Sequence, residues 1–255
     1  MASPTQSQID EQNRLLAALP RPEYERLLPD IEPVSLAQKQ SLTEPDEPIT
    51  HVYFPRGAVA SILAYMADGA AVEGATVGRE GLIGLPMLMG DGIGTEVAIC
   101  QVPGPAARIR SEALLAIAPQ SSALMQAVHR YALALMGQMV RTAGCNRVHP
   151  VEERCARWLL MTADRVGANE FPLTQEFLAA MLGVRRPSVS LAAGMLQQAG
   201  FITYKWGQVR ILNREGLEQT ACEDYRLTKQ IYDSLYGGTA TDLTARADGQ
   251  LAGPR

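Results

Sequence analysis

The 255-residue sequence predicts an α+β protein with an N-terminal antiparallel β-roll (double-stranded β-helix or jelly-roll type), a long dimerisation helix and a C-terminal winged helix-turn-helix. Three observations predict this order. Short β-prone runs fill residues 34–109, a stripe with alternating spacings of four and three runs through 119–146, and residues 173–202 read as two short helices around a glycine. We therefore expect a sensor roll with N-terminal helices over 1–118, the dimerisation helix over 119–146, the winged helix-turn-helix over 147–236 and a disordered tail over 237–255.

The composition is that of an ordinary globular protein, with 47% apolar residues, 20% charged residues and a formal net charge of -4. No apolar run reaches the roughly 20 residues of a membrane span, and no signal-like segment opens the sequence, so we expect a cytoplasmic protein without membrane contacts. The four cysteines (Cys100, Cys145, Cys155 and Cys222) form no C-x-x-C pair and no close Cys/His cluster, which predicts no metal site and no disulfide framework. Cys145 and Cys155 flank a predicted hinge, which raises the hypothesis that they respond to oxidation.

A mobile start over 1–8 and two short helices precede the roll. Helical spacing over 9–28 is interrupted at Pro20 and Pro22, which splits it in two. The strands of the roll are expected over 51–54, 59–66, 72–77, 96–102 and 106–110, between Gly, Pro and Asp residues. A roll of this kind can enclose a small molecule.

The stripe in the long helix consists of Leu124, Val128, Tyr131, Leu135, Gln138 and Thr142, followed by Cys145. Such a stripe can pair with its own copy, and we expect it to be the seam of a homodimer. A single helix buried in its own chain gives a similar stripe, so both interpretations stay open. After a hinge over 147–150, residues 151–166 have the spacing of an amphipathic helix that packs under the winged helix.

The helix-turn-helix is predicted from local signals. Thr174 is a candidate N-cap for a first helix that runs to about Leu182, Gly183 supplies a left-handed residue, and Pro187 suits the start of a second helix. The buried face of the second helix is expected at Val189, Ala192, Ala193 and Leu196. The N-terminal end of the second helix carries arginines and serines. In a recognition helix this is the end that reaches base edges.

A hairpin with a Trp206-Gly207 tip is expected to follow, over 201–204 and 208–212. Between residues 171 and 214 five basic residues stand against one acid, a local balance of +4 that suits nucleic acid. The candidate DNA contacts are Thr174, Arg185, Arg186, Pro187, Ser188, Ser190, Lys205 and Arg210.

This order of segments resembles the Crp/Fnr family of bacterial transcription regulators over about residues 9–236. The resemblance implies that a ligand in the roll shifts the dimer helix and hinge, and so sets the spacing of two recognition helices on a palindromic site. It places Arg185, Arg186 and Ser188 at positions that contact DNA in relatives. Pro187 and Leu191 stand where an acid and a further arginine read bases in the cyclic-AMP-responsive members, so the operator is expected to differ.

The sensor departs from the members that bind cyclic nucleotides, in which a Gly-Glu pair holds the ribose and an Arg-Ser pair further along neutralises the phosphate. In the matching segment Gly84 is present, Leu85 replaces the acid, and Thr95 and Glu96 replace Arg-Ser. The phosphate would meet a like charge at Glu96, so neither cyclic AMP nor cyclic GMP is expected to bind. The residues left to line an effector pocket are Arg79, Gly84, Leu85, Met87, Thr95 and Glu96.

No cofactor is expected. An iron-sulfur cluster needs several closely spaced thiolates, and no cysteine precedes Cys100. Haem would require His51, His129 or Cys100 as an axial ligand, although a lone histidine is more often structural.

These observations predict a homodimeric, sequence-specific regulator that binds double-stranded DNA, with an unknown small-molecule effector, and with RNA polymerase as a further partner if it activates transcription. The alternative is a ligand-sensing module whose winged helix contacts another protein. No nucleophile, base and orienting residue can be assembled from the scattered histidines and cysteines, so an enzyme is not expected.

Overall fold

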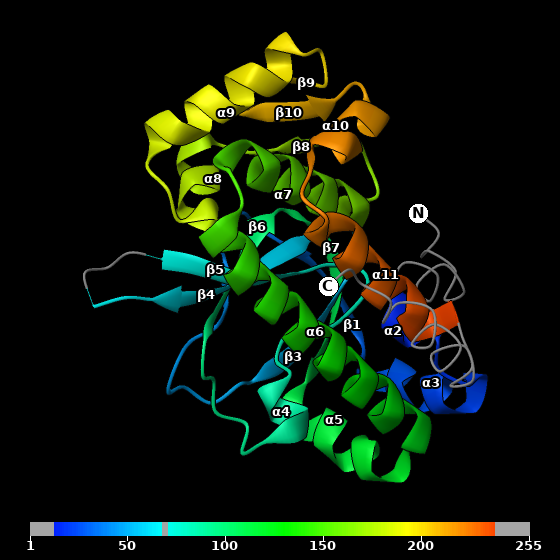
Figure 1. The fold of residues 1–255 in the computed structure, drawn as a ribbon. Coiled ribbons are helices and arrows are strands. Elements are labelled where there is room, and N and C mark those ends of the chain that lie inside the picture. The colour runs from blue at the N-terminus through cyan, green and yellow to red at the C-terminus, as the bar shows by residue number, and fades with distance from the viewer. Residues whose placement is uncertain (1–12, 68–70, 238–255) are drawn as a thin grey trace, which may run out of the picture.

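The computed structural model describes residues 13–67 and 71–237. A β-roll occupies the lower part of the view in Figure 1, the long helix α6 crosses in front of it, and a unit of short helices with a hairpin lies above. The expectations for 1–8 and for a tail after Tyr236 fall almost entirely outside the described residues. None of the described helices is long and apolar enough to cross a lipid bilayer.

The roll consists of two antiparallel sheets. The strand order is β1-β7-β3 in one sheet and β2-β6-β4-β5 in the other. The bounds are Glu32–Leu36 for β1, Ser41–Thr43 for β2, His51–Pro55 for β3, Val59–Tyr65 for β4, Ala71–Val77 for β5, Val97–Val102 for β6 and Gly104–Arg110 for β7. The five predicted runs correspond to β3–β7, whereas β1 contains Pro33 and β2 has only three residues, so both lacked a recognisable strand pattern.

Short helices frame the roll. The two predicted N-terminal helices are α2 (Arg14–Ala17) and α3 (Arg21–Leu27), and the roll adds α4 (Pro86–Met89) and α5 (Ser111–Ile117), which were not predicted. Asn13 caps α2 through its Oδ1, and its buried Nδ2 donates to the carbonyls of Pro55 and Gly81, both at 2.9 Å. This side chain ties the start of the described chain to the roll.

Helix α6 (Ser122–Val148) buries the predicted seam inside its own chain. The six seam residues (Leu124, Val128, Tyr131, Leu135, Gln138 and Thr142) are all at most 6% exposed in the single chain. They face the roll and the last helix, α11 (Asp224–Gly237), whose Tyr232 hydroxyl donates to Gln138 Oε1 at 2.7 Å. The seam prediction was therefore wrong, because the stripe pairs with the chain's own core and not with a second copy.

The upper unit begins where α6 ends. His149 and Pro150 have extended backbones between α6 and α7 (Val151–Val166), so the predicted hinge reduces to these two residues. The unit then contains β8 (Glu170–Pro172), α8 (Gln175–Leu182), α9 (Arg186–Gln198), β9 (Ile202–Lys205), β10 (Gln208–Ile211) and α10 (Arg214–Thr220), with strand order β8-β10-β9. Its core contains apolar side chains from α7, α8, α9 and the sheet.

Candidate nucleic-acid interface and effector cavity

The α8–α9 pair forms as the sequence predicts. The Thr174 hydroxyl accepts a hydrogen bond from the Phe177 amide at 3.1 Å, which caps α8. Gly183 ends α8 with φ 61°, and Pro187 lies in the first turn of α9. The buried residues of α9 are Val189, Ala192, Ala193 and Leu196, as predicted.

The N-terminal end of α9 faces solvent. Arg185, Arg186, Pro187 and Ser188 are all exposed, and in Figure 1 α9 lies along the top of the molecule, away from the roll. The Ser190 hydroxyl donates to Gln175 Oε1 at 2.6 Å, which joins α9 to α8. The start of α9 has no side-chain cap hydrogen bond, and the helix dipole together with the two arginines makes it a favourable place for a phosphate or a base edge.

The predicted basic surface is partly neutralised by acids. Arg186 pairs with Glu176 at 2.8 Å, Arg210 pairs with Glu170 at 2.6 Å, and Arg214 pairs with Asp164 and Glu218. In the part of the chain that the structure describes, Arg185 and Lys205 have no ion pair. The Arg186 and Arg210 pairs are largely exposed, and such pairs contribute little, so both guanidinium groups remain available to DNA.

The hairpin tip exposes the aromatic side chain of Trp206, which was not among the DNA contacts predicted from the sequence. Trp206 and Gly207 have φ values of 54° and 71°, and Trp206 is 98% exposed. On α9, Leu191 and Met195 are also exposed. The helical spacing in the sequence could have placed both residues outside the buried face of α9. Apolar side chains at such positions can contact thymine methyl groups.

A cavity of about 240 Å³ lies between the roll and α6. Of the predicted effector residues, Gly84, Leu85, Thr95 and Glu96 line it, together with apolar residues of α4 and α6. Met87 instead lines a separate depression, and Arg79 lies in the polar pocket described next, so the predicted set does not form one site. Among the described residues no cation lines the cavity, and neither His51, His129 nor Cys100 does, so it presents neither a phosphate site nor any of the three candidate haem ligands.

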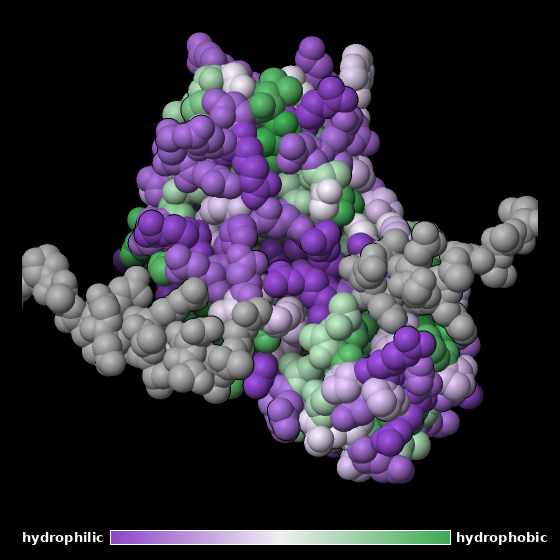
Figure 2. Space-filling model, turned by 90° about the vertical axis from the view of Figure 1, so that its right-hand side faces the viewer, coloured by the Kyte–Doolittle hydropathy of each residue, from purple (hydrophilic) through white to green (hydrophobic). Residues whose placement is uncertain are grey.

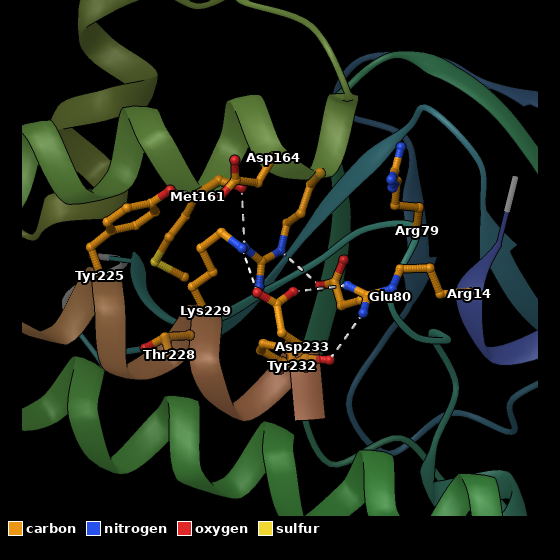
Figure 3. Close-up of a pocket in the computed structure, with 11 residues that line it drawn as sticks. Arg14, Arg79, Glu80, Met161, Asp164, Tyr225, Thr228, Lys229, Tyr232 and Asp233 are labelled. Atoms are coloured by element: carbon orange, nitrogen blue, oxygen red, sulfur yellow. Dashed lines mark hydrogen bonds and ion pairs between the residues drawn. The ribbon is translucent and has the colours of Figure 1, made fainter. Parts of the chain in front are cut away.

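A polar pocket of about 190 Å³ lies where α7, α11 and the roll meet (Figure 3). Arg165 Nε lies 2.8 Å from Glu80 Oε1, and both side chains are buried. Nη2 of Arg165 donates to Gln138 Oε1 at 3.1 Å, and Gln138 Nε2 donates to Thr76 Oγ1 at 3.2 Å. On the side of the molecule that carries α10, α11 and α2, hydrophilic residues also predominate over the middle of the surface (Figure 2). The ion pair and hydrogen bonds of Arg165 and Gln138 connect β5, the chain after it, α6 and α7.

The thiols are arranged differently from the prediction. Burial raises the pKa of Cys155 to about 12 and that of Cys100 to about 11, which makes both poor candidates for oxidation. Cys145 instead lies 3.4 Å from Cys222, sulfur to sulfur, and this hydrogen bond lowers the pKa of Cys145 to about 7. His149 and Asp224 complete a compact group with these two thiols, which contradicts the expectation that the chain has no close Cys/His cluster.

Comparisons with known proteins agree with this architecture. Residues 153–220 match the Crp-like helix-turn-helix domain, and no curated protein matches the chain in sequence. FixK2 from Bradyrhizobium japonicum is 17% identical, with a TM-score of 0.64 over 75% of this chain and 98% of its own. The c-di-GMP-responsive regulator CLP from Xanthomonas campestris is 16% identical, with a TM-score of 0.60 over 75% and 99%. A CRP-family transcriptional regulator from Thermus thermophilus is 18% identical, with a TM-score of 0.62 over 74% and 96%.

These likenesses show the fold, and the domain match covers the helix-turn-helix itself. Residues 153–220 therefore form a Crp-like helix-turn-helix domain, in a chain that has the fold of these solved transcription regulators.

Proposed function

We propose that the protein is a homodimeric, sequence-specific regulator that reads double-stranded DNA with the N-terminal end of α9 and contacts the backbone with the hairpin. The observation that carries this proposal is the exposed N-terminal end of α9, where Arg185 and Arg186 face solvent while the opposite face of the helix packs into the core of the domain. An arginine at this place can bind a phosphate or donate two hydrogen bonds to guanine. Thr174, Ser188, Ser190, Lys205 and Arg210 are proposed as further contacts, with Pro187 shaping the helix start.

The proposed dimer uses the outer face of α6. Leu133, Met136 and Val140 are 69%, 61% and 73% exposed, at spacings of three and four. Large apolar side chains in such a row lose contact with water when a second copy pairs along the same helix. A parallel pair of α6 helices would carry two copies of α9 to half-sites roughly one helical turn of DNA, about 34 Å, apart.

The proposed effector is apolar. The cavity beside α6 is lined by leucine, isoleucine and methionine side chains, with Thr95 and Glu96 as its polar members. Met136 lines this cavity and also belongs to the proposed dimer face, so an occupant would act directly on the pairing of α6. RNA polymerase is a further proposed partner if the regulator activates transcription.

The test of DNA reading begins with selection of operator sequences by the full-length protein, followed by fluorescence anisotropy with the selected duplex. Arg185→Ala is expected to weaken binding by about 1–3 kcal/mol if the residue reads a base, with relaxed preference at one position. If it contacts a phosphate, affinity falls for all sequences and the salt slope decreases by about 0.9.

The control is Arg21→Ala, which also removes an exposed arginine but lies on α3, away from α9; its ion pair with Glu25 matches that of Arg186 with Glu176. Arg186→Ala provides the second variant, with loss of operator selectivity expected. If wild type and both α9 variants bind DNA equally weakly and without selectivity, the proposal fails, and ligand-dependent capture of a protein by the hairpin face becomes the favoured function.

The dimer is tested by sedimentation of Leu133→Glu/Val140→Glu. We expect a shift from dimer to monomer, because two carboxylates would enter an apolar interface. Leu115→Glu places the same charge at another exposed leucine and should leave the mass unchanged. A wild-type protein that sediments as a monomer at high concentration would contradict the dimer while leaving the DNA reading testable.

A further inference from the structure

Four side chains with metal-ligand chemistry converge where α6 ends and α11 begins. Cys145 and His149 are one helical turn apart at the end of α6, and Cys222 and Asp224 flank the start of α11. One ligand atom from each lies within 4.8 Å of every other. None of these four residues lines the effector cavity or belongs to the exposed end of α9.

We propose that Cys145, His149, Cys222 and Asp224 bind a tetrahedral divalent cation, with Zn²⁺ as the ion that fits this donor set. Ligands at Zn–S, Zn–N and Zn–O bond lengths lie about 3.4–3.8 Å from one another. The Cys145 and Cys222 sulfurs are 3.4 Å apart, and His149 Nδ1 is 3.6 Å from Asp224 Oδ2. Small side-chain shifts would therefore complete the site.

The neighbours already orient two of the ligands. His149 Nε2 lies 3.4 Å from the Glu223 carboxylate, and its buried Nδ1 has no hydrogen-bond partner among the described residues. A carboxylate on one ring nitrogen leaves the other free to bind the metal, as in carboxylate–histidine–zinc arrangements. Asp224 repeats the pattern, because Arg141 Nη1 holds its Oδ1 at 3.1 Å while Oδ2 faces the histidine.

The charge of the surroundings suits an occupied site. Two thiolates, one carboxylate and Zn²⁺ carry a net charge of about -1. Arg154 and Arg157 are buried beside the thiols, and within the described part of the chain Nε of each lacks a hydrogen-bond partner. These guanidinium groups favour the thiolate forms that a metal requires.

The site would join the end of α6 to the start of α11, next to the His149–Pro150 break that precedes the DNA-binding domain. Because only the folded chain holds the four ligands close to one another, a bound cation would stabilise the folded arrangement around the His149–Pro150 break. The proposal does not depend on DNA binding, since the metal can be measured in the protein alone.

The experiment is a Co²⁺ titration of the full-length, reduced, metal-free protein, followed by visible absorption. We expect one Co²⁺ per chain with the intense ligand-field bands of tetrahedral thiolate coordination, displaced by Zn²⁺. The bands should vanish in Cys145→Ser/Cys222→Ser and persist in Cys100→Ser, a matched loss of a buried thiol from the roll.

Glu223→Gln is the second variant, and it does not remove a ligand. It should retain the bands but weaken Co²⁺ affinity about 10–100-fold, because the ring loses its carboxylate partner. Absence of the bands in the folded, reduced wild-type protein would overturn the proposal. The proposal would also be overturned if the isolated protein contained a Cys145–Cys222 disulfide and did not bind Co²⁺ after that disulfide was reduced.

Discussion

The helix-turn-helix and the junction beneath it are stabilised in opposite ways. In the α8–α9 pair the core is apolar and the charges lie outside, where Arg186 and Glu176 are each 62% exposed. At the junction, which we define by Glu73, Glu80, Gln138, Arg165 and Tyr232, charged and polar groups are buried between elements far apart in the sequence. A charge can therefore be changed on α9 without disturbing the fold, whereas a change at the junction leaves a buried partner uncompensated.

The largest expected effect is therefore at Arg165. Arg165→Met should destabilise the protein by about 3–5 kcal/mol, because it leaves the buried Glu80 carboxylate without its cation. Chemical denaturation followed by circular dichroism measures the loss. Arg186→Met, which breaks an exposed pair, is the matched control and should cost at most about 1 kcal/mol.

A double variant separates lost charge from lost packing. In Glu80→Gln/Arg165→Met the remaining buried charge is also removed, so part of the stability should return. If Arg165→Met and Arg186→Met cost the same, the contrast between the junction and the helix-turn-helix is wrong.

The same contrast explains what the sequence could predict. The α8–α9 pair depends on residues within a few positions of one another, such as the Thr174 cap, the left-handed Gly183 and the spacing of Val189 and Leu196, and all are found as predicted. The strands of the roll from His51 onward followed equally well from local runs.

Long-range packing escaped prediction. Helix α6 carries two apolar stripes, and the positions of the roll and of α11 decide which of them is covered. The stripe that contains Leu124 and Thr142 faces inward, and the stripe that contains Leu133 and Val140 faces solvent. Likewise, Cys222 is 77 residues from Cys145, and the i, i+4 spacing of Cys145 and His149 was the only sequence signal of their cluster.

An intermediate effect is expected at Glu73, which joins the roll to α7. Its buried carboxylate accepts hydrogen bonds from Trp158 Nε1 at 3.0 Å and from Ser61 Oγ at 2.8 Å. Burial raises its pKa from 4.5 to about 7, so the folded state holds the proton more tightly than the unfolded chain. The stabilisation is complete below pH 4.5 and is lost as the pH rises through 7.

Glu73→Gln should remove this dependence. Wild type is expected to lose up to about 3 kcal/mol of unfolding free energy between pH 5 and 8 through this group, and the variant should have a correspondingly flatter profile. Denaturation at each pH measures the difference. Glu25→Gln, a change of an exposed carboxylate on α3, should leave the profile parallel to that of wild type. Parallel profiles for Glu73→Gln as well would show that the carboxylate does not titrate in this range.

The smallest expected change in stability is at the hairpin tip. A side chain that is fully exposed there contrasts most clearly with the buried groups of the junction. Trp206 and Gly207 both have positive φ between paired Lys205 and Gln208, the backbone of a two-residue turn that favours Asn-Gly. A tryptophan that is 98% exposed gains nothing from packing there and carries a backbone conformation that asparagine adopts at lower cost.

Trp206→Asn should therefore leave stability unchanged or raise it by less than about 1 kcal/mol, while it weakens binding to the selected duplex. Denaturation and anisotropy on the same preparation measure both quantities. A variant that loses stability would show that the indole has a structural role. A variant that binds the duplex as wild type does would show that the indole does not contact DNA.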